Sequence, residues 1–180
     1  KTLLLGCALV ALYACNRAEP TSLTTPAGTT LSALQSEQPA DAVIGQDFYD
    51  TNDLPMVSGL GFGSSGDITQ HGTTLFVSDP TNSRILLFED AHTMASGSAA
   101  TGVIGQTDVF HAWELDYSIV ARKMTTSEEG ALYVYSSHGQ VYVYLTPQSA
   151  SYPDYSLLDT PVPVTGMAVL PNNLLAISGE

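Results

Sequence analysis

The chain has 180 residues, of which 44% are hydrophobic and 13% charged, a composition typical of a globular domain and not of a disordered one. Its formal net charge is −13, from 18 acidic residues against 5 Lys and Arg, and no basic run occurs. This balance argues against a nucleic-acid surface or a patch for anionic lipids, both of which need clustered Lys and Arg. The acidity favours solubility; the alternative is a surface for cationic ligands.

Residues 1–14 begin with a Lys and continue as an apolar stretch that is too short to cross a bilayer as a helix. They predict a signal peptide for export. The chain starts without Met, so we expect the numbering to begin late or the 5′ end to be incomplete. Both cysteines, Cys7 and Cys15, lie in or next to this leader, so the body of the chain has no disulfide framework.

The sequence Leu-Tyr-Ala-Cys that ends at Cys15 resembles the lipobox of bacterial lipoproteins. That resemblance implies that Cys15 becomes the lipidated first residue of the mature protein, anchored to the bacterial (outer) membrane of the cell envelope. The alternative is a periplasmic or secreted protein. Residues 15–41 are rich in Ser, Thr and Pro and show no period of 2 or 3.6, so they predict a disordered tether between the lipidated N-terminus and residues 42–180.

The stretch Leu75–Phe88 predicts one β-hairpin. Leu75–Val77 and Ile85–Phe88 are short apolar runs, and Asp79–Ser83 between them is a cluster of turn-forming residues. Two buried strands joined by a polar corner are therefore expected here.

Parts of this pattern recur along the chain. Val-Ile-Gly-Gln occurs at 43–46 and again at 103–106, and Leu132–Tyr135 matches Leu75–Ser78. A third copy begins at Leu175–Ser178. Periods of this length, built from short strands, are typical of propellers and solenoids.

The segment Asp-x-x-Asn-x-Arg, filled here by Asp79, Asn82 and Arg84, and the apolar x-Gly-Gln segment between repeats resemble the NHL-repeat β-propeller family. The resemblance implies an all-β propeller over residues 42–180, with about two blades and the opening strand of a third. A closed ring needs about four to eight blades, so we expect the chain to be a fragment or to share a ring with other copies.

The resemblance also implies that Asp79, Asn82 and Arg84 form a structural clamp at the hairpin corner. Physically, a guanidinium group can meet a carboxylate through two parallel hydrogen bonds. The alternative is a polar ligand pocket at the same residues.

The stretch Leu132–Leu145 predicts a second hairpin, in which aliphatic residues alternate with Tyr133, Tyr135, Tyr142 and Tyr144. We expect one aliphatic face and one tyrosine face. The tyrosines are interpreted as core packing, with a platform for carbohydrate or peptide as the alternative.

The sequence contains no recognisable catalytic, cofactor-binding or metal-binding motif. Its four histidines, His71, His92, His111 and His138, fall in predicted loops without ligand spacing. We therefore expect a binding or scaffold module for a protein or another extracytoplasmic ligand, with no nucleic-acid partner, no cofactor, and contact with the membrane only through the lipid anchor. The alternatives are a lactonase-like or lyase-like propeller enzyme whose metal site is completed by residues missing from the chain, and a structural envelope component.

Overall fold

The computed structural model describes residues 42–45, 57–64, 66–112, 119–148, 152–159 and 163–179. The chain divides into two units, Lys1–Gln38 and Pro39–Glu180, and every described residue lies in the second. The predicted signal peptide, Cys15 and the predicted tether lie outside the described residues. Within the described ranges, no helix has the length and apolar character needed to span a bilayer.

The first sheet is an antiparallel meander of four strands, in the order β1-β2-β3-β4. The strands are β1 (Ile68–His71), β2 (Thr74–Asp79), β3 (Arg84–Phe88) and β4 (Gly102–Ile104). The predicted hairpin is confirmed as β2 and β3, joined by a 3-10 turn, η1 (Pro80–Asn82). A second 3-10 turn, η2 (Ala91–Thr93), follows β3.

The second sheet repeats this meander in the order β5-β6-β7-β8. Its strands are β5 (Ala121–Thr126), β6 (Leu132–Ser136), β7 (Gln140–Tyr144) and β8 (Tyr155–Asp159). The predicted second hairpin is confirmed as β6 and β7.

The third sheet has two described strands, β9 (Val164–Leu170) and β10 (Leu174–Gly179), which pair antiparallel. The expectation that the third copy, Leu175–Ser178, belongs to the opening strand of its blade is therefore wrong. β10 is the second strand of its sheet, because β9 precedes it and pairs with it. The three apolar segments aligned by the repeat thus fall on β2, β6 and β10, the same strand of each sheet.

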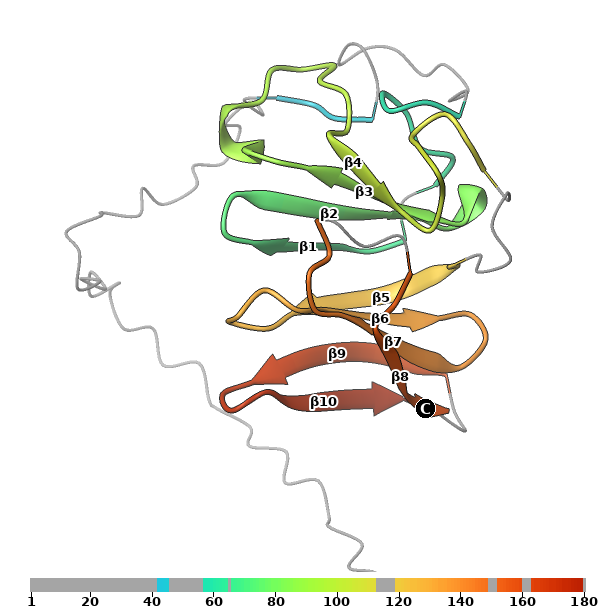
Figure 1. Ribbon diagram of the computed structural model, residues 1–180, viewed down its shortest axis with the longest axis vertical. Helices are drawn as coiled ribbons and strands as arrows, with labels where there is room; N and C mark the ends of the chain where they lie inside the picture. The colour runs from blue at the N-terminus through green and yellow to red at the C-terminus, as the bar shows by residue number, and fades with distance from the viewer. Residues whose placement is uncertain are drawn as a thin grey trace, which may run out of the picture. The chain divides into compact units, whose positions relative to one another are not determined.

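The three sheets approach one another through their first strands, since β1 lies next to β5 and β5 next to β9. Figure 1 shows β1 and β5 as the adjoining edges of the two four-stranded sheets. The Asp67 carboxylate accepts a hydrogen bond from the Met124 N–H at 2.7 Å, and the Thr126 hydroxyl donates to the Gln70 carbonyl at 2.8 Å. Four-stranded antiparallel sheets that meet at their first strands have the arrangement of propeller blades. The predicted all-β class is confirmed.

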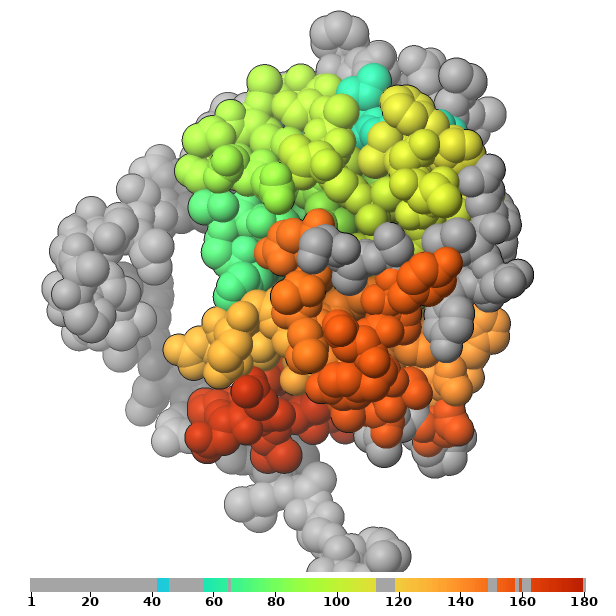
Figure 2. All heavy atoms as spheres, viewed as in Figure 1, coloured from blue at the N-terminus to red at the C-terminus, as the bar shows by residue number. Residues whose placement is uncertain are grey.

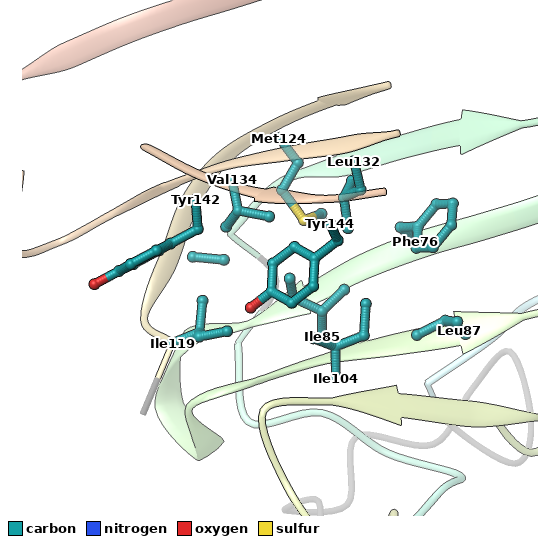
Figure 3. Packing of buried hydrophobic residues seen from close by; sticks show 11 residues of the cluster. Phe76, Ile85, Leu87, Ile104, Ile119, Met124, Leu132, Val134, Tyr142 and Tyr144 are labelled. Carbon is teal, nitrogen blue, oxygen red and sulfur yellow. The ribbon is translucent and has the colours of Figure 1, made fainter. Parts of the chain in front are cut away.

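The main core lies between the first two sheets (Figure 3). Phe76, Ile85 and Leu87 face it from the first sheet, and Leu132 and Val134 from the second. In the space-filling view, atoms of the two sheets abut on the face turned toward the viewer (Figure 2). The remaining members of this cluster are Ile104, Ile119, Ala121, Met124, Tyr142 and Tyr144.

Two further clusters cover the outer faces of these sheets. Val77, Leu86 and Phe88 pack on the far side of the first sheet. Val141 and Val143 of the second sheet pack with Val164 and with half-buried side chains of β9 and β10, namely Met167, Val169, Leu175 and Ile177. The first two sheets are therefore apolar on both faces, as expected for sheets that are covered on both sides.

The predicted tyrosine face is wrong, because the register of β6 and β7 mixes the two residue types. Leu132 lies opposite Tyr144, and Tyr133 lies opposite Val143. Cross-strand partners share a face of the sheet, so each face carries two tyrosines and two aliphatic residues. All four tyrosines are at most 8% exposed, which confirms core packing instead of a surface platform.

The two Val-Ile-Gly copies differ in structure although their glycines match. Val103 and Ile104 belong to β4, whereas residues 42–45 form no regular element and are held by a hydrogen bond from the Gly97 N–H to the Val43 carbonyl at 3.0 Å. Gly45 and Gly105 both have positive φ values, of 87° and 89°, which favour glycine. The repeat thus preserves the turn after the apolar pair but not its strand.

Candidate functional site

The three residues of the predicted clamp come together at the corner between β2 and β3. One carboxylate oxygen of Asp79 accepts hydrogen bonds from Asn82 Nδ2 at 2.8 Å and from Arg84 Nε at 2.9 Å. The other oxygen accepts from the Gly63 N–H at 3.0 Å. The Asp79 and Arg84 side chains are both 0% exposed, so the ion pair is buried and not partly exposed at the surface.

Arg84 does not form the two parallel bonds to Asp79 that the motif suggested. Its terminal nitrogens donate instead to the backbone carbonyls of Ser58, Gly61 and Val109. One guanidinium group therefore joins the hairpin corner to the loop before β1 and to the loop after β4. Because every oxygen and nitrogen of the pair has a partner within the protein, this arrangement leaves little capacity to bind an external ligand.

The turn that carries the Val109 carbonyl is stabilised by Asp108. Its carboxylate accepts hydrogen bonds from the Phe110 N–H at 2.8 Å and lies 2.6 Å from His111 Nδ1. The Phe110 N–H, and secondarily His111, lower the pKa of the exposed Asp108 carboxyl. The Asp108 carboxyl therefore stays ionised as the pH falls to the ordinary pKa of an aspartate.

A larger candidate site lies next to the hairpin corner, where residues of all three sheets line one space. An open cavity of about 820 Å³ is lined by the β2–β3 turn, the start of β5, the β6–β7 turn and the start of β9. Its described lining consists of Ser64, Gly66, Pro80, Thr81, Val120, Arg122, Lys123, Tyr135, Ser137, Pro163 and Val164. We call this space the inter-blade cavity.

The inter-blade cavity is lined by two cationic side chains, Arg122 and Lys123, and by no carboxylate among its described residues. The only other Lys or Arg in residues 42–180 is Arg84, which is buried in the clamp. Neither Arg122 nor Lys123 forms an ion pair with another described residue. The free positive charge of this acidic domain is thus concentrated at one place.

A β-bulge explains how two consecutive strand residues line one cavity. Successive side chains in a regular strand point to opposite faces. In β5, however, Ala121 lies opposite Ser136 and Lys123 opposite Tyr135, so Arg122 is an extra residue without a partner on β6. Bulges of this kind redirect side chains and occur near functional sites.

The walls of the inter-blade cavity are held by short polar contacts. The Ser64 and Thr81 hydroxyls are 2.7 Å apart, and the Ser137 N–H donates to the Val120 carbonyl at 3.0 Å. Gly66 allows the closest approach, because a Cβ there would lie 2.6 Å from Ser78 Oγ and 2.9 Å from the Ala121 carbonyl oxygen. The cavity therefore combines cations, hydroxyls and apolar groups such as Tyr135.

A smaller hollow of about 380 Å³ lies near the β5–β6 turn, between Glu129, Tyr133 and Tyr155. The pKa of the Glu129 carboxyl is lowered by hydrogen bonds from the backbone N–H of Glu129 and from the Ser127 side chain. Burial, with the nearby Tyr155 and Glu129, raises the pKa of Tyr133. This hollow therefore places the ionised Glu129 carboxylate beside the neutral Tyr133 phenol.

The histidines lie apart from one another. His71 is the last residue of β1, so the prediction that it falls in a loop is wrong, whereas His92, His111 and His138 lie between strands as predicted. Within the described ranges, no three His, Cys, Asp or Glu side chains gather closely enough to hold a metal ion. Cys15 lies outside the described residues.

The inter-blade cavity was not predicted from the sequence. The signal that could have indicated it was the isolated Arg122-Lys123 pair, the only two adjacent basic residues in a chain with 5 Lys and Arg. The position of that pair beside the β2–β3 and β6–β7 turns, however, depends on the packing of separate blades.

No family model and no curated protein matches the sequence. Among solved structures, the chain is similar to a regucalcin from Agrobacterium tumefaciens strain C58, described as a calcium-binding protein. The similarity has a TM-score of 0.43 and 18% sequence identity and covers 61% of this chain. It covers 35% of the regucalcin chain, so this chain spans about a third of that structure.

Proposed function

We propose that this chain is part of an NHL-like β-propeller that acts as a binding module for an extracytoplasmic ligand. The observation that carries the proposal is the inter-blade cavity, which the first two sheets and the start of β9 build together. Its mixture of hydroxyl, cationic and apolar groups suits a ligand that is partly polar and partly apolar. The cavity lies where successive sheets meet. Its walls come from the turns of the first two sheets and from the first strands β5 and β9.

A ligand screen with a cavity-filling variant tests this proposal. Full-length protein is screened by thermal shift against small neutral, cationic and anionic compounds, beside Ser137→Trp, which places an indole at the cavity wall, and Thr73→Trp, an exposed control at the β1–β2 turn. We expect compounds that stabilise the parent and Thr73→Trp but not Ser137→Trp. The proposal is overturned if no compound binds the parent or if Ser137→Trp binds equally well.

We further propose that the module is exported and held at the bacterial membrane by acylation of Cys15. The support is the apolar leader and the Leu-Tyr-Ala-Cys segment at its end. Two or more acyl chains, at about 0.8 kcal/mol per buried CH₂, anchor a protein stably. Cell fractionation of parent and Cys15→Ser measures this: we expect the variant to leave the membrane fraction, and equal retention would contradict acylation.

A further inference from the structure

The inter-blade cavity carries an inference about the chemistry of its ligand, which rests on the proposed function. In a domain with few basic residues, the two that are not buried are neighbours in β5 and line the same cavity. A solvated surface pair would need no special backbone. Here a bulge at Arg122 interrupts the ladder between β5 and β6, and both residues line the cavity.

The electrostatic setting of the cavity points to an anion. The formal charge of the chain is −13, so the protein as a whole repels anions and an anionic ligand needs a local positive site. No Asp or Glu occurs among the described lining residues to neutralise Arg122 and Lys123. Guanidinium and ammonium groups both form charge-assisted hydrogen bonds to carboxylate and phosphate oxygens.

The other lining groups suit the body of a small ligand. The Ser64–Thr81 pair and Ser137 provide exposed hydroxyls, while Pro80, Val120 and Pro163 provide apolar surface. Two adjacent cations favour a group with two negative charges over a single charge. We propose that the inter-blade cavity binds a small oxyanion ligand, a dicarboxylate or a phosphate monoester, through Arg122 and Lys123.

The test is a calorimetric titration of the full-length protein with defined probes. The probes are succinate, for the carboxylate source, and phenyl phosphate, for the phosphate source; succinamide and phenol are their neutral counterparts. We expect at least one anion to bind and its neutral counterpart not to bind. The anion that binds with the higher affinity shows whether the ligand's charge comes from carboxylates or from a phosphate.

Three variants assign the binding to the cavity. In Arg122→Gln/Lys123→Gln, we expect affinity for the anion to fall at least about tenfold, since each charge-assisted bond contributes more than a neutral one. Arg122→Lys/Lys123→Arg keeps both charges and should retain binding within a few fold. Thr73→Glu changes the net charge by one unit at the opposite end of the first sheet and should leave binding unchanged.

The inference is overturned if neither anion binds, if the neutral counterparts bind equally well, or if the double Gln variant keeps its affinity with an unchanged melting temperature. These results differ from a failure of the proposed function. Neutral or cationic hits that Ser137→Trp abolishes would leave the binding module standing and remove only the oxyanion.

Discussion

Each side-chain nitrogen of Arg84 donates a hydrogen bond to an acceptor within the protein. The effect of the buried Asp79–Arg84 ion pair on the stability of the blade can be measured by mutation. We expect Asp79→Ala and Arg84→Ala to cost about 3–5 kcal/mol each, because either change leaves a buried charge unpaired. Arg84→Ala should cost more, since it also removes the donors to three backbone carbonyls. Urea denaturation measures both, and the double variant should cost at least about 1 kcal/mol less than the sum.

The control for this cycle is Thr73→Ala, an exposed residue before β2 that should change stability by less than about 0.5 kcal/mol. Strictly additive losses in the cycle would show that Asp79 and Arg84 act independently. The motif predicted which side chains meet, because all three lie within one turn. The carbonyls of Ser58, Gly61 and Val109 could not be predicted, since they come from two loops whose positions depend on the folding of the whole sheet.

The junction between β1 and β5 depends on Asp67, which is half-buried and lies before β1. Its carboxylate accepts the Met124 N–H at 2.7 Å, and Met124 is 5% exposed. We expect Asp67→Ala to destabilise the protein by about 1–3 kcal/mol, because the buried N–H loses its partner. Asp67→Asn keeps an acceptor oxygen and should cost less. Denaturation combined with exchange of the Met124 amide measures both effects.

Thr126→Val is the matched control, since it removes the other bond across this junction, the solvent-exposed bond from the Thr126 hydroxyl to the Gln70 carbonyl. Its cost should be smaller than that of Asp67→Ala. If Asp67→Asn is as damaging as Asp67→Ala, the charge of Asp67 matters and not its capacity to accept a hydrogen bond.

Strands were predictable from the sequence where both faces are buried. β2, β3, β6 and β7 are apolar runs bounded by turn residues, and each was expected from its pattern. The first strands were not, because β5 reads Ala-Arg-Lys-Met-Thr-Thr and β1 is half exposed. Their pairing comes from the neighbouring strand and from bonds between blades. The bulge in β5, which places Arg122, leaves no mark in a single sequence.

The register of β6 and β7 shows a second limit at this scale. Alternation within each strand was correct, but which face each strand presents depends on the length of the connecting turn. Here Tyr135 lies opposite Val141, so the tyrosines of one strand share a face with the valines of the other. A turn longer or shorter by one residue would have produced the single tyrosine face that the sequence suggested.

In the molecule as a whole, the apolar contacts between the first two sheets are more deeply buried than those that hold the third sheet. The cluster between the first two sheets consists of side chains that are at most 8% exposed, among them Phe76, Ile85 and Leu132. β9 and β10 are held mainly by half-buried side chains, and Leu170 and Leu174 are 44% and 63% exposed. Local stability follows the burial of apolar contacts, so the first two sheets should open together and the third separately.

Hydrogen exchange followed by mass spectrometry on the full-length chain measures this difference. We expect the slowest amides in β2, β3, β6 and β7, whose residues are buried or nearly so. The fastest strand amides should lie in β8, whose described side chains are exposed, and in β10, whose side chains are exposed or half-buried. Ile85→Ala creates a cavity in the shared core and should cost about 2–5 kcal/mol while raising exchange in both four-stranded sheets. Exchange raised only in β1–β4 would mean that the sheets are independent units, and protection of β10 equal to that of β3 would contradict the weaker attachment of the third sheet.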